Sequence, residues 1–257
     1  MTTDPVAPRP ASTLILLRET EVQPLQTLMV VRHQDIKFAG GAIVFPGGRV
    51  DESDFALADT RDDDPFKIAA IRETFEESGI LLAYHAASGA AVSQAVAARA
   101  LAKHRAAVCN GALTFADMLH EKGLVAATDR LVPFAHWITP PSRSKRFDTH
   151  FFVARYAEDQ HADHDGGEIT EAVWISPSDL VRAARDGQYK LVFATRMNVE
   201  RLAAFTTVEH ALEEIHATPV VTVRPETIDT PEGKRVRIPA AAGYGGELFV
   251  SNDPLAI

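Results

Sequence analysis

Three glutamates stand within five positions of the segment 69–83: Glu73, Glu76 and Glu77. If this segment is helical, a rotation of about 100° per residue places the three carboxylates on one face. Like charges at that spacing repel by about a few tenths of a kcal/mol per exposed pair, and a divalent cation would reverse the sign. Carboxylate oxygens are the ligands that Mg²⁺ and Mn²⁺ prefer, commonly beside substrate phosphates. The cluster therefore predicts metal-dependent phosphate chemistry, with a solvated acidic helix face as the alternative.

A turn signal stands upstream of the glutamates. The apolar run 42–45 is followed by Pro46, Gly47 and Gly48, and this punctuation predicts that the strand stops there. Glycines at such a turn let the backbone approach a neighbouring element closely.

Turn and helix together resemble the signature of the Nudix hydrolase family. The family's box runs glycine, five free positions, glutamate, seven free positions, then Arg-Glu-apolar-any-Glu-Glu-any-Gly-apolar. This chain shows Gly48, Asp54 and the run Arg72 to Ile80 in that order. It departs from the box at Thr74 and Asp54, and 17 residues separate Asp54 from Arg72, an insertion of ten.

The resemblance implies roles for the residues of the second half of the box. Glu73, Glu76 and Glu77 are expected to be catalytic ligands of Mg²⁺ or Mn²⁺, and Arg72 to pair with acids and hold the loop. Removal of a proton from the attacking water needs a base. Helix glutamates serve as that base in some members of the family and a glutamate of a later loop in others, for which Glu168 is the candidate here.

Arg32, Gly41 and the run Phe45 to Gly48 stand at the spacings of a motif found before the box in the coenzyme A diphosphatase branch of the family. Lys37 replaces an arginine of that motif and His33 replaces a serine. The segment is therefore similar to this branch, which includes a mammalian peroxisomal enzyme.

The downstream segment ITPPSRSKRFDTHFFVARY, residues 138–156, adds to this similarity. Arginine forks and lysine charges suit the diphosphate and 3′-phosphate of coenzyme A, although a basic run is often only a solvated loop. The candidate substrate-binding residues are Arg32, Lys37, Gly47, Gly48, Arg143 and Arg146.

The resemblance implies hydrolysis of coenzyme A or an acyl-coenzyme A to 3′,5′-ADP and (acyl-)phosphopantetheine. Another nucleoside diphosphate conjugate, such as ADP-ribose, NADH or a nucleotide sugar, would use the same glutamates. A Nudix domain that only senses or binds a ligand is a second alternative. His161 and His164 lie in a polar loop, where solvation is favoured over a transition-metal site.

The elements that position these residues alternate irregularly between strand and helix, which predicts an α+β fold. The resemblance implies an α/β/α sandwich with a mixed sheet. We expect a disordered arm at 1–11, a Nudix domain at 12–217 with a helical insertion at about 86–127, and a C-terminal extension at 218–257 that forms a hairpin on the domain or on a partner. Apolar runs predict strands at 12–17, 25–31, 42–45, 131–138, 147–156 and 171–177.

Three further elements follow from local signals. Residues 51–65 carry acids without apolar periodicity and are expected to form a loop, after which Pro65 opens the glutamate helix. The helix buries Ile68, Ile71 and Phe75, which recur at helical spacing. Helices are also predicted at 176–187 and 192–216, and two strands around the turn 231–233.

Composition excludes several classes of function. Lysine and arginine number 26 against 35 acidic residues, and the net charge of −9 argues against a nucleic-acid partner. The apolar run 14–17 is far shorter than a membrane span. With one cysteine, no basic leader and no peroxisomal address, we expect a cytoplasmic protein. Its expected partner is a small nucleoside diphosphate derivative, and homodimerisation stays open.

Overall fold

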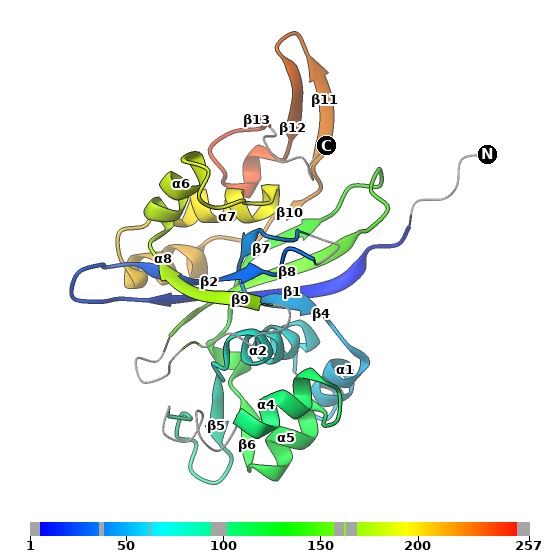
Figure 1. Cartoon of the computed structure of the whole chain (residues 1–257), viewed down its shortest axis with the longest axis vertical. Helices are drawn as coiled ribbons and strands as arrows, with labels where there is room; N and C mark the ends of the chain where they lie inside the picture. The colour runs from blue at the N-terminus through cyan, green and yellow to red at the C-terminus, as the bar shows by residue number, and fades with distance from the viewer. Residues whose placement is uncertain are drawn as a thin grey trace.

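A central mixed sheet organises the chain (Figure 1). The structure is a computed structural model that describes residues 6–35, 39–61, 63–93, 102–156, 162 and 169–250. The strand order is β10-β7-β8-β1-β2-β3, with β4 paired to β1 and β9 to β2. The β1–β8 and β10–β7 pairs are parallel. The strands are β1 Arg9–Arg18, β2 Gln26–Arg32, β3 Ile43–Val44, β4 Gly47–Arg49, β7 Val132–Ile138, β8 Phe147–Arg155, β9 Ile169–Ile175 and β10 Thr222–Val223.

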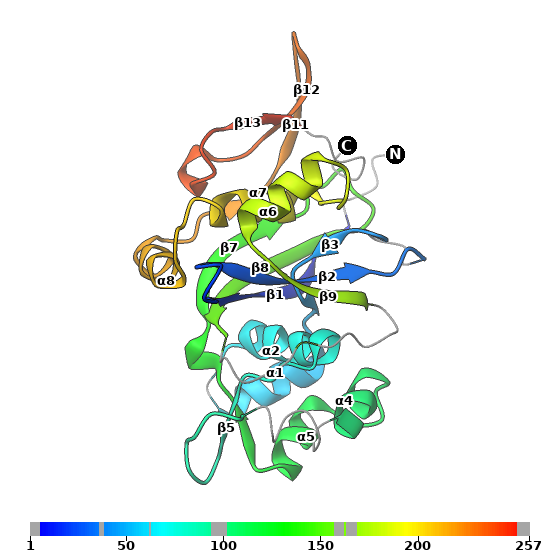
Figure 2. The ribbon, with the colours of Figure 1, turned by 60° about the vertical axis from the view of Figure 1, so that its left-hand side comes forward.

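Helices cover both faces of this sheet (Figures 1 and 2). On one side lie α1 Glu52–Asp59 and α2 Pro65–Ser78, and beyond them, farther from the sheet, lie α4 Ala102–Cys109 and α5 Phe115–Glu121. The opposite layer holds α6 Pro177–Arg185, α7 Phe193–Leu202 and α8 Val208–Ala217. This arrangement confirms the α+β class and the sandwich with a mixed sheet.

Two smaller sheets complete the fold. Strands β5 Ala83–His85 and β6 Leu124–Ala126 pair antiparallel at the two ends of the insertion. Strands β11 Glu226–Thr230, β12 Gly233–Arg237 and β13 Leu248–Val250 form a sheet that projects beyond α7 (Figure 1). Short 3₁₀ turns lie at Thr128–Arg130 and Ala240–Ala242. The predicted pair of strands around 231–233 is confirmed by the β11–β12 register.

Strand β1 is buried on both faces, as expected for a central strand of a sheet that helices cover on both sides. Leu14 and Leu16 belong to the core on the α2 side, whereas Ile15 and Leu17 belong to the core on the α7 side. The strand begins at Arg9, three residues earlier than the apolar run predicts, because it pairs with β8 from Arg9 onward.

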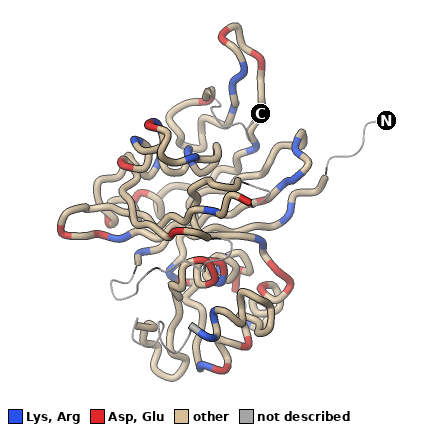
Figure 3. Tube along the Cα trace, viewed as in Figure 1, with Lys and Arg blue, Asp and Glu red and all other residues tan. Residues whose placement is uncertain are grey.

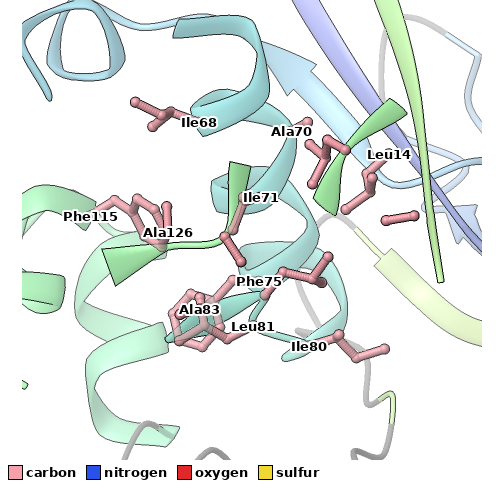
Figure 4. Close-up of a cluster of buried hydrophobic side chains, with 14 of the residues drawn as sticks. Leu14, Ile68, Ala70, Ile71, Phe75, Ile80, Leu81, Ala83, Phe115 and Ala126 are labelled. Atoms are coloured by element: carbon pink, nitrogen blue, oxygen red, sulfur yellow. The ribbon is translucent and has the colours of Figure 1, made fainter. Parts of the chain in front are cut away.

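Helix α2 begins at Pro65, as the sequence predicts, and ends at Ser78, so residues 79–83 lie outside it. The Asp64 carboxylate accepts a hydrogen bond from the Phe66 backbone N–H at 2.9 Å, and Pro65 occupies the first turn. Gly79 ends the helix with φ of 75° in the left-handed region, which glycine adopts without strain. As predicted, Ile68, Ile71 and Phe75 are buried, and Figure 4 shows this face in the core beside Phe115 and Ala126.

The expectation of a loop over 51–65 is wrong, because α1 occupies Glu52–Asp59. A capping box begins this helix. The Asp54 side chain accepts a hydrogen bond from the Asp51 backbone N–H, and the Asp51 side chain accepts one from the Asp54 backbone N–H. Asp54 and Ala58 are buried one turn apart. Two of the acids that obscure the apolar periodicity of this segment, Asp51 and Asp54, therefore form the cap that starts the helix.

The single helix expected at 192–216 is also wrong. The chain leaves α7 at Leu202, and α8 begins at Val208. Thr207 is extended and its side chain accepts from the His210 backbone N–H, which caps a new helix. A hydroxyl cap can start a helix inside a segment whose composition favours continuous helix.

The remaining differences concern strands at turns. The strand at 42–45 is shorter than predicted, and β4 resumes at Gly47 because it pairs with β1. Residues 124–126 belong to β6, although the sequence places them in the helical insertion. Within the described part of the chain, no helix has the length and apolar character needed to cross a membrane.

Candidate functional site

The Arg72 guanidinium organises the acidic face of α2. Its Nε and Nη2 donate to the two carboxylate oxygens of Asp54 at 2.9 and 2.8 Å, a paired fork geometry. Nη1 donates to Glu73 at 2.9 Å and to Glu76 at 3.0 Å, and Nη2 also donates to the Arg49 carbonyl at 2.7 Å. Arg72 therefore connects α1, β4 and two glutamates of α2.

Gly48 lies directly against the Glu73 carboxylate. A Cβ atom at position 48 would stand 2.5 Å from Glu73 Cδ and Oε2, closer than ordinary side-chain contacts allow. The turn after β3 therefore brings the backbone so close to the acidic helix that a side chain at position 48 would displace the Glu73 carboxylate.

Glu77 contacts Gly47, the other glycine of the turn. Its Oε2 accepts a hydrogen bond from the Gly47 N–H at 2.9 Å, and its Oε1 lies 3.8 Å from Arg32 Nη1. A Cβ at Gly47 would come within 2.4 Å of the Ser12 carbonyl oxygen, so this turn is also closed on the β1 side. Glu77 is 5% exposed, and its carboxylate thus joins α2, the turn and β2.

Burial and neighbouring negative charge make Glu73 and Glu76 resist ionisation. Burial is the main cause that raises the pKa of Glu73 from its usual 4.5 to about 7, and Glu76 adds to the rise while Arg72 opposes it. Burial likewise raises the pKa of Glu76. Arg72 stays charged: burial disfavours its cationic form, but hydrogen bonds with Asp54 and the charge of Glu73 raise its pKa.

The donor set fits a divalent cation. Five carboxylates meet two guanidinium groups through these contacts, so negative charge is in excess. The carboxylates belong to Asp51, Asp54, Glu73, Glu76 and Glu77, and Figure 3 shows acidic positions gathered on and beside α2. The excess of carboxylates over guanidinium groups leaves the cluster short of positive charge, which Mg²⁺ or Mn²⁺ would supply through oxygen ligands.

The raised pKa of Glu73 predicts how pH affects the metal-free protein. Between pH 4.5 and about 7 the unfolded chain releases this proton while the folded chain keeps it, so the free energy of unfolding falls as pH rises. The loss reaches about 3 kcal/mol above pH 7, at about 1.4 kcal/mol per pKa unit. Glu73→Gln lacks this contribution, so its stability relative to the parent should increase over that window.

Urea unfolding in EDTA at several pH values measures this difference. The exposed Glu200→Gln serves as the matched control and should follow the parent chain. Parallel pH curves for the parent and Glu73→Gln would show that Glu73 titrates normally.

An unexpected support of α2 comes from the insertion. Arg105 of α4 donates from Nε to the Glu76 backbone carbonyl at 2.9 Å, within the last turn of α2. The last carbonyls of a helix lack partners inside the helix, and a cation there also interacts favourably with the helix dipole. Sequence alone gives no signal for this contact, because Arg105 lies 29 positions away in an alanine-rich stretch.

The candidate substrate-binding residues Arg32, Arg143 and Arg146 lie in different places in the structure. Arg32 lies beside Glu77 and lines a pocket of about 450 Å³ with Gly41 and Thr170. Arg146 instead contacts the Thr139 carbonyl at 3.0 Å and the Val6 carbonyl at 2.5 Å. Arg143 lies in the β7–β8 connection, where its N–H donates to the Pro140 carbonyl. Lys37, Glu168, His161 and His164 lie outside the described residues.

Sequence matches agree with this geometry. A family model described as NUDT19 Nudix domain matches residues 56–202. A Caenorhabditis elegans protein named as a nudix hydrolase is 32% identical over 183 residues, covering 71% of this chain and 56% of that protein. A Xenopus laevis protein named acyl-coenzyme A diphosphatase NUDT19 is 26% identical over 212 residues, covering 64% of this chain and 56% of the relative.

The Gallus gallus protein of the same name is 29% identical over 165 residues, covering 59% of this chain and 43% of that protein. The chain thus spans about half the length of the relatives that it matches. Among solved structures, a NUDIX hydrolase from Alicyclobacillus acidocaldarius has a TM-score of 0.73 at 28% identity. That match covers 81% of this chain and 96% of the other.

Proposed function

The chain belongs to the Nudix hydrolase family, and from this membership we propose that it hydrolyses the diphosphate bond of coenzyme A or an acyl-coenzyme A. The products would be 3′,5′-ADP and (acyl-)phosphopantetheine. The observation that carries the proposal is the contact of the Gly47-Gly48 turn with two glutamates of α2. The names of two relatives support the choice of coenzyme A.

Glu73, Glu76 and Glu77 would hold the divalent cation, because their carboxylates form the acidic face of α2. When bound, Mg²⁺ or Mn²⁺ supplies electrostatic stabilisation of the diphosphate oxygens and lowers the pKa of water. Arg72 orients Glu73 and Glu76 through one nitrogen, Nη1. The Gly47 N–H fixes Glu77 in the same way, so the ligand carboxylates are positioned before substrate arrives.

The remaining residues would serve the substrate and the attacking water. Arg32 is placed beside Glu77 and at the rim of a pocket, where a guanidinium can hold a phosphate oxygen. Arg143, Arg146 and Lys37 are our further candidates for the phosphates of coenzyme A. Glu168 is our candidate for the base that removes the proton of water.

A substrate panel tests the proposal. The purified chain is incubated with Mg²⁺ or Mn²⁺ and with coenzyme A, an acyl-coenzyme A, ADP-ribose, NADH or a nucleotide sugar, and products are identified by mass. We expect 3′,5′-ADP and phosphopantetheine from coenzyme A. Cleavage of ADP-ribose with coenzyme A untouched would overturn the substrate, and ligand binding without any turnover would favour a non-catalytic binding module.

Gly48→Ala should lower activity while preserving the fold. The new Cβ displaces the Glu73 carboxylate, which is the flexible end of its side chain, so the backbone need not move. A displacement of about 1 Å in a positioned catalytic group costs about 10²-fold in rate. Steady-state kinetics measure the effect, and Gly246→Ala is the matched control because its Cβ would lie 3.8 Å from the nearest atom, in Phe249.

A further inference from the structure

Two histidines and an aspartate lie together on the sheet, apart from the glutamate cluster. His136 of β7 and Asp148 and His150 of β8 each offer one ligand atom, and these atoms lie within 4.8 Å of one another. Asp148 Oδ1 is 2.5 Å from His136 Nε2 and 3.9 Å from His150 Nε2. One carboxylate oxygen therefore faces a nitrogen of each imidazole.

The strands and their neighbours hold both rings in place. His136 pairs with His150 across the antiparallel β7–β8 ladder, and the ring centroids are 4.2 Å apart. His136 Nδ1 is 2.8 Å from the Thr222 hydroxyl of β10, which leaves Nε2 directed to Asp148. The His150 ring packs at 4.2 Å against Phe66. The three side chains are partly exposed and thus accessible to an ion.

The cluster is separate from the acidic face of α2. Phe66, which contacts His150, precedes Glu73 by seven residues, so the two positions are about 10 Å apart along the helix axis. The roles assigned to Arg72 and the glutamates leave the cluster unused. Its donors also differ in chemistry, because imidazole nitrogens suit Zn²⁺ and carboxylate oxygens alone suit Mg²⁺.

We propose that His136, Asp148 and His150 form a zinc-binding site. Two imidazoles and one carboxylate are a common protein donor set for Zn²⁺, and three protein ligands leave a fourth position for water. The Thr222 hydroxyl on Nδ1 matches the outer hydrogen bond that orients a metal-binding histidine. Zn²⁺ would take the place of the proton shared by His136 and Asp148.

The site would fasten the chain after α8 to the sheet. Strand β10 pairs with β7 through only two residue pairs, Thr222 with His136 and Val223 with Trp137. Bound Zn²⁺ would fix His136 and, through it, Thr222. Because the ion binds the folded chain, it would also raise the melting temperature, and the rise would grow with the logarithm of its free concentration above Kd.

Zinc titration of the full chain tests the site. Protein stripped with EDTA and returned to excess Mg²⁺ is titrated with Zn²⁺ by calorimetry, and zinc K-edge X-ray absorption at one equivalent identifies imidazole ligands. We expect one saturable site with two imidazoles. It should disappear in His150→Ala and Asp148→Asn and persist in His120→Ala, which changes an exposed histidine of α5.

Two more variants separate the possible outcomes. Thr222→Val keeps all three ligands and should weaken zinc binding by about 10- to 100-fold, and Glu77→Gln should keep the site. Loss of zinc in Glu77→Gln with retention in His150→Ala would place the ion at the glutamates and overturn the proposal. Absence of imidazole from the absorption spectrum of the parent chain would overturn it without any variant.

Discussion

Glu77→Gln is expected to lower kcat by about 10³-fold while the protein stays folded. The amide is isosteric with the carboxylate, and its oxygen can still accept the Gly47 N–H that Oε2 accepts at 2.9 Å. The charge is lost, however, and metal-assisted charge stabilisation is worth several kcal/mol in such reactions. At about 1.4 kcal/mol per tenfold change in rate, this corresponds to about three orders of magnitude.

Kinetics at saturating Mn²⁺ and substrate, with circular dichroism as the test of folding, measure this effect. Glu200→Gln removes an equally sized charge from an exposed position of α7 and should keep the parent rate. Undiminished turnover in Glu77→Gln would remove Glu77 from the set of metal ligands. This outcome differs from failure of the coenzyme A assignment, in which another substrate is cleaved and the variant still loses activity.

Arg72→Met is expected to destabilise the protein by about 3–5 kcal/mol. The Arg72 fork is the hydrogen-bond partner of both carboxylate oxygens of Asp54, which is 1% exposed. Breaking a buried pair on one side leaves an uncompensated charge, which accounts for a cost of this size. For a chain of this length the melting temperature should fall by about 10 °C or more.

Urea unfolding at neutral pH measures the loss, and two variants identify its origin. Arg72→Lys keeps the charge but not the fork, so it should fall between the parent and Arg72→Met. Asp54→Asn combined with Arg72→Met should cost less than the sum of the single changes, because the two groups interact directly. Additive costs would show that the Asp54–Arg72 pair contributes little to stability.

The Asp54–Arg72 pair also explains how the chain accommodates its lengthened box. The described residues among the 17 between them include most of α1 and the first turns of α2. These helices pack against each other, so the two ends of the segment meet at 2.8 Å. Sequence spacing leaves the role of Asp54 open, because spacing along the chain does not fix distance once a helix forms in between.

Local patterns alone determine the acidic helix. Asp64, Pro65 and Gly79 mark its ends, and the apolar residues recur at helical spacing, because caps and periodicity act within one or two turns. The same patterns place most strands of the sheet. They fail at α1, where charge obscures the buried positions, and at Thr207, where one hydroxyl divides a helix.

The identity and spacing of the glutamates already specify the type of donor at the acidic site, which is a face of carboxylates. The groups that contact this face come from distant parts of the chain and depend on how the elements pack. Gly47 reaches Glu77 across 30 positions, and His136 reaches Thr222 across 86. Contacts over such separations depend on strand order and on the path of the chain between helices, and no local preference encodes either.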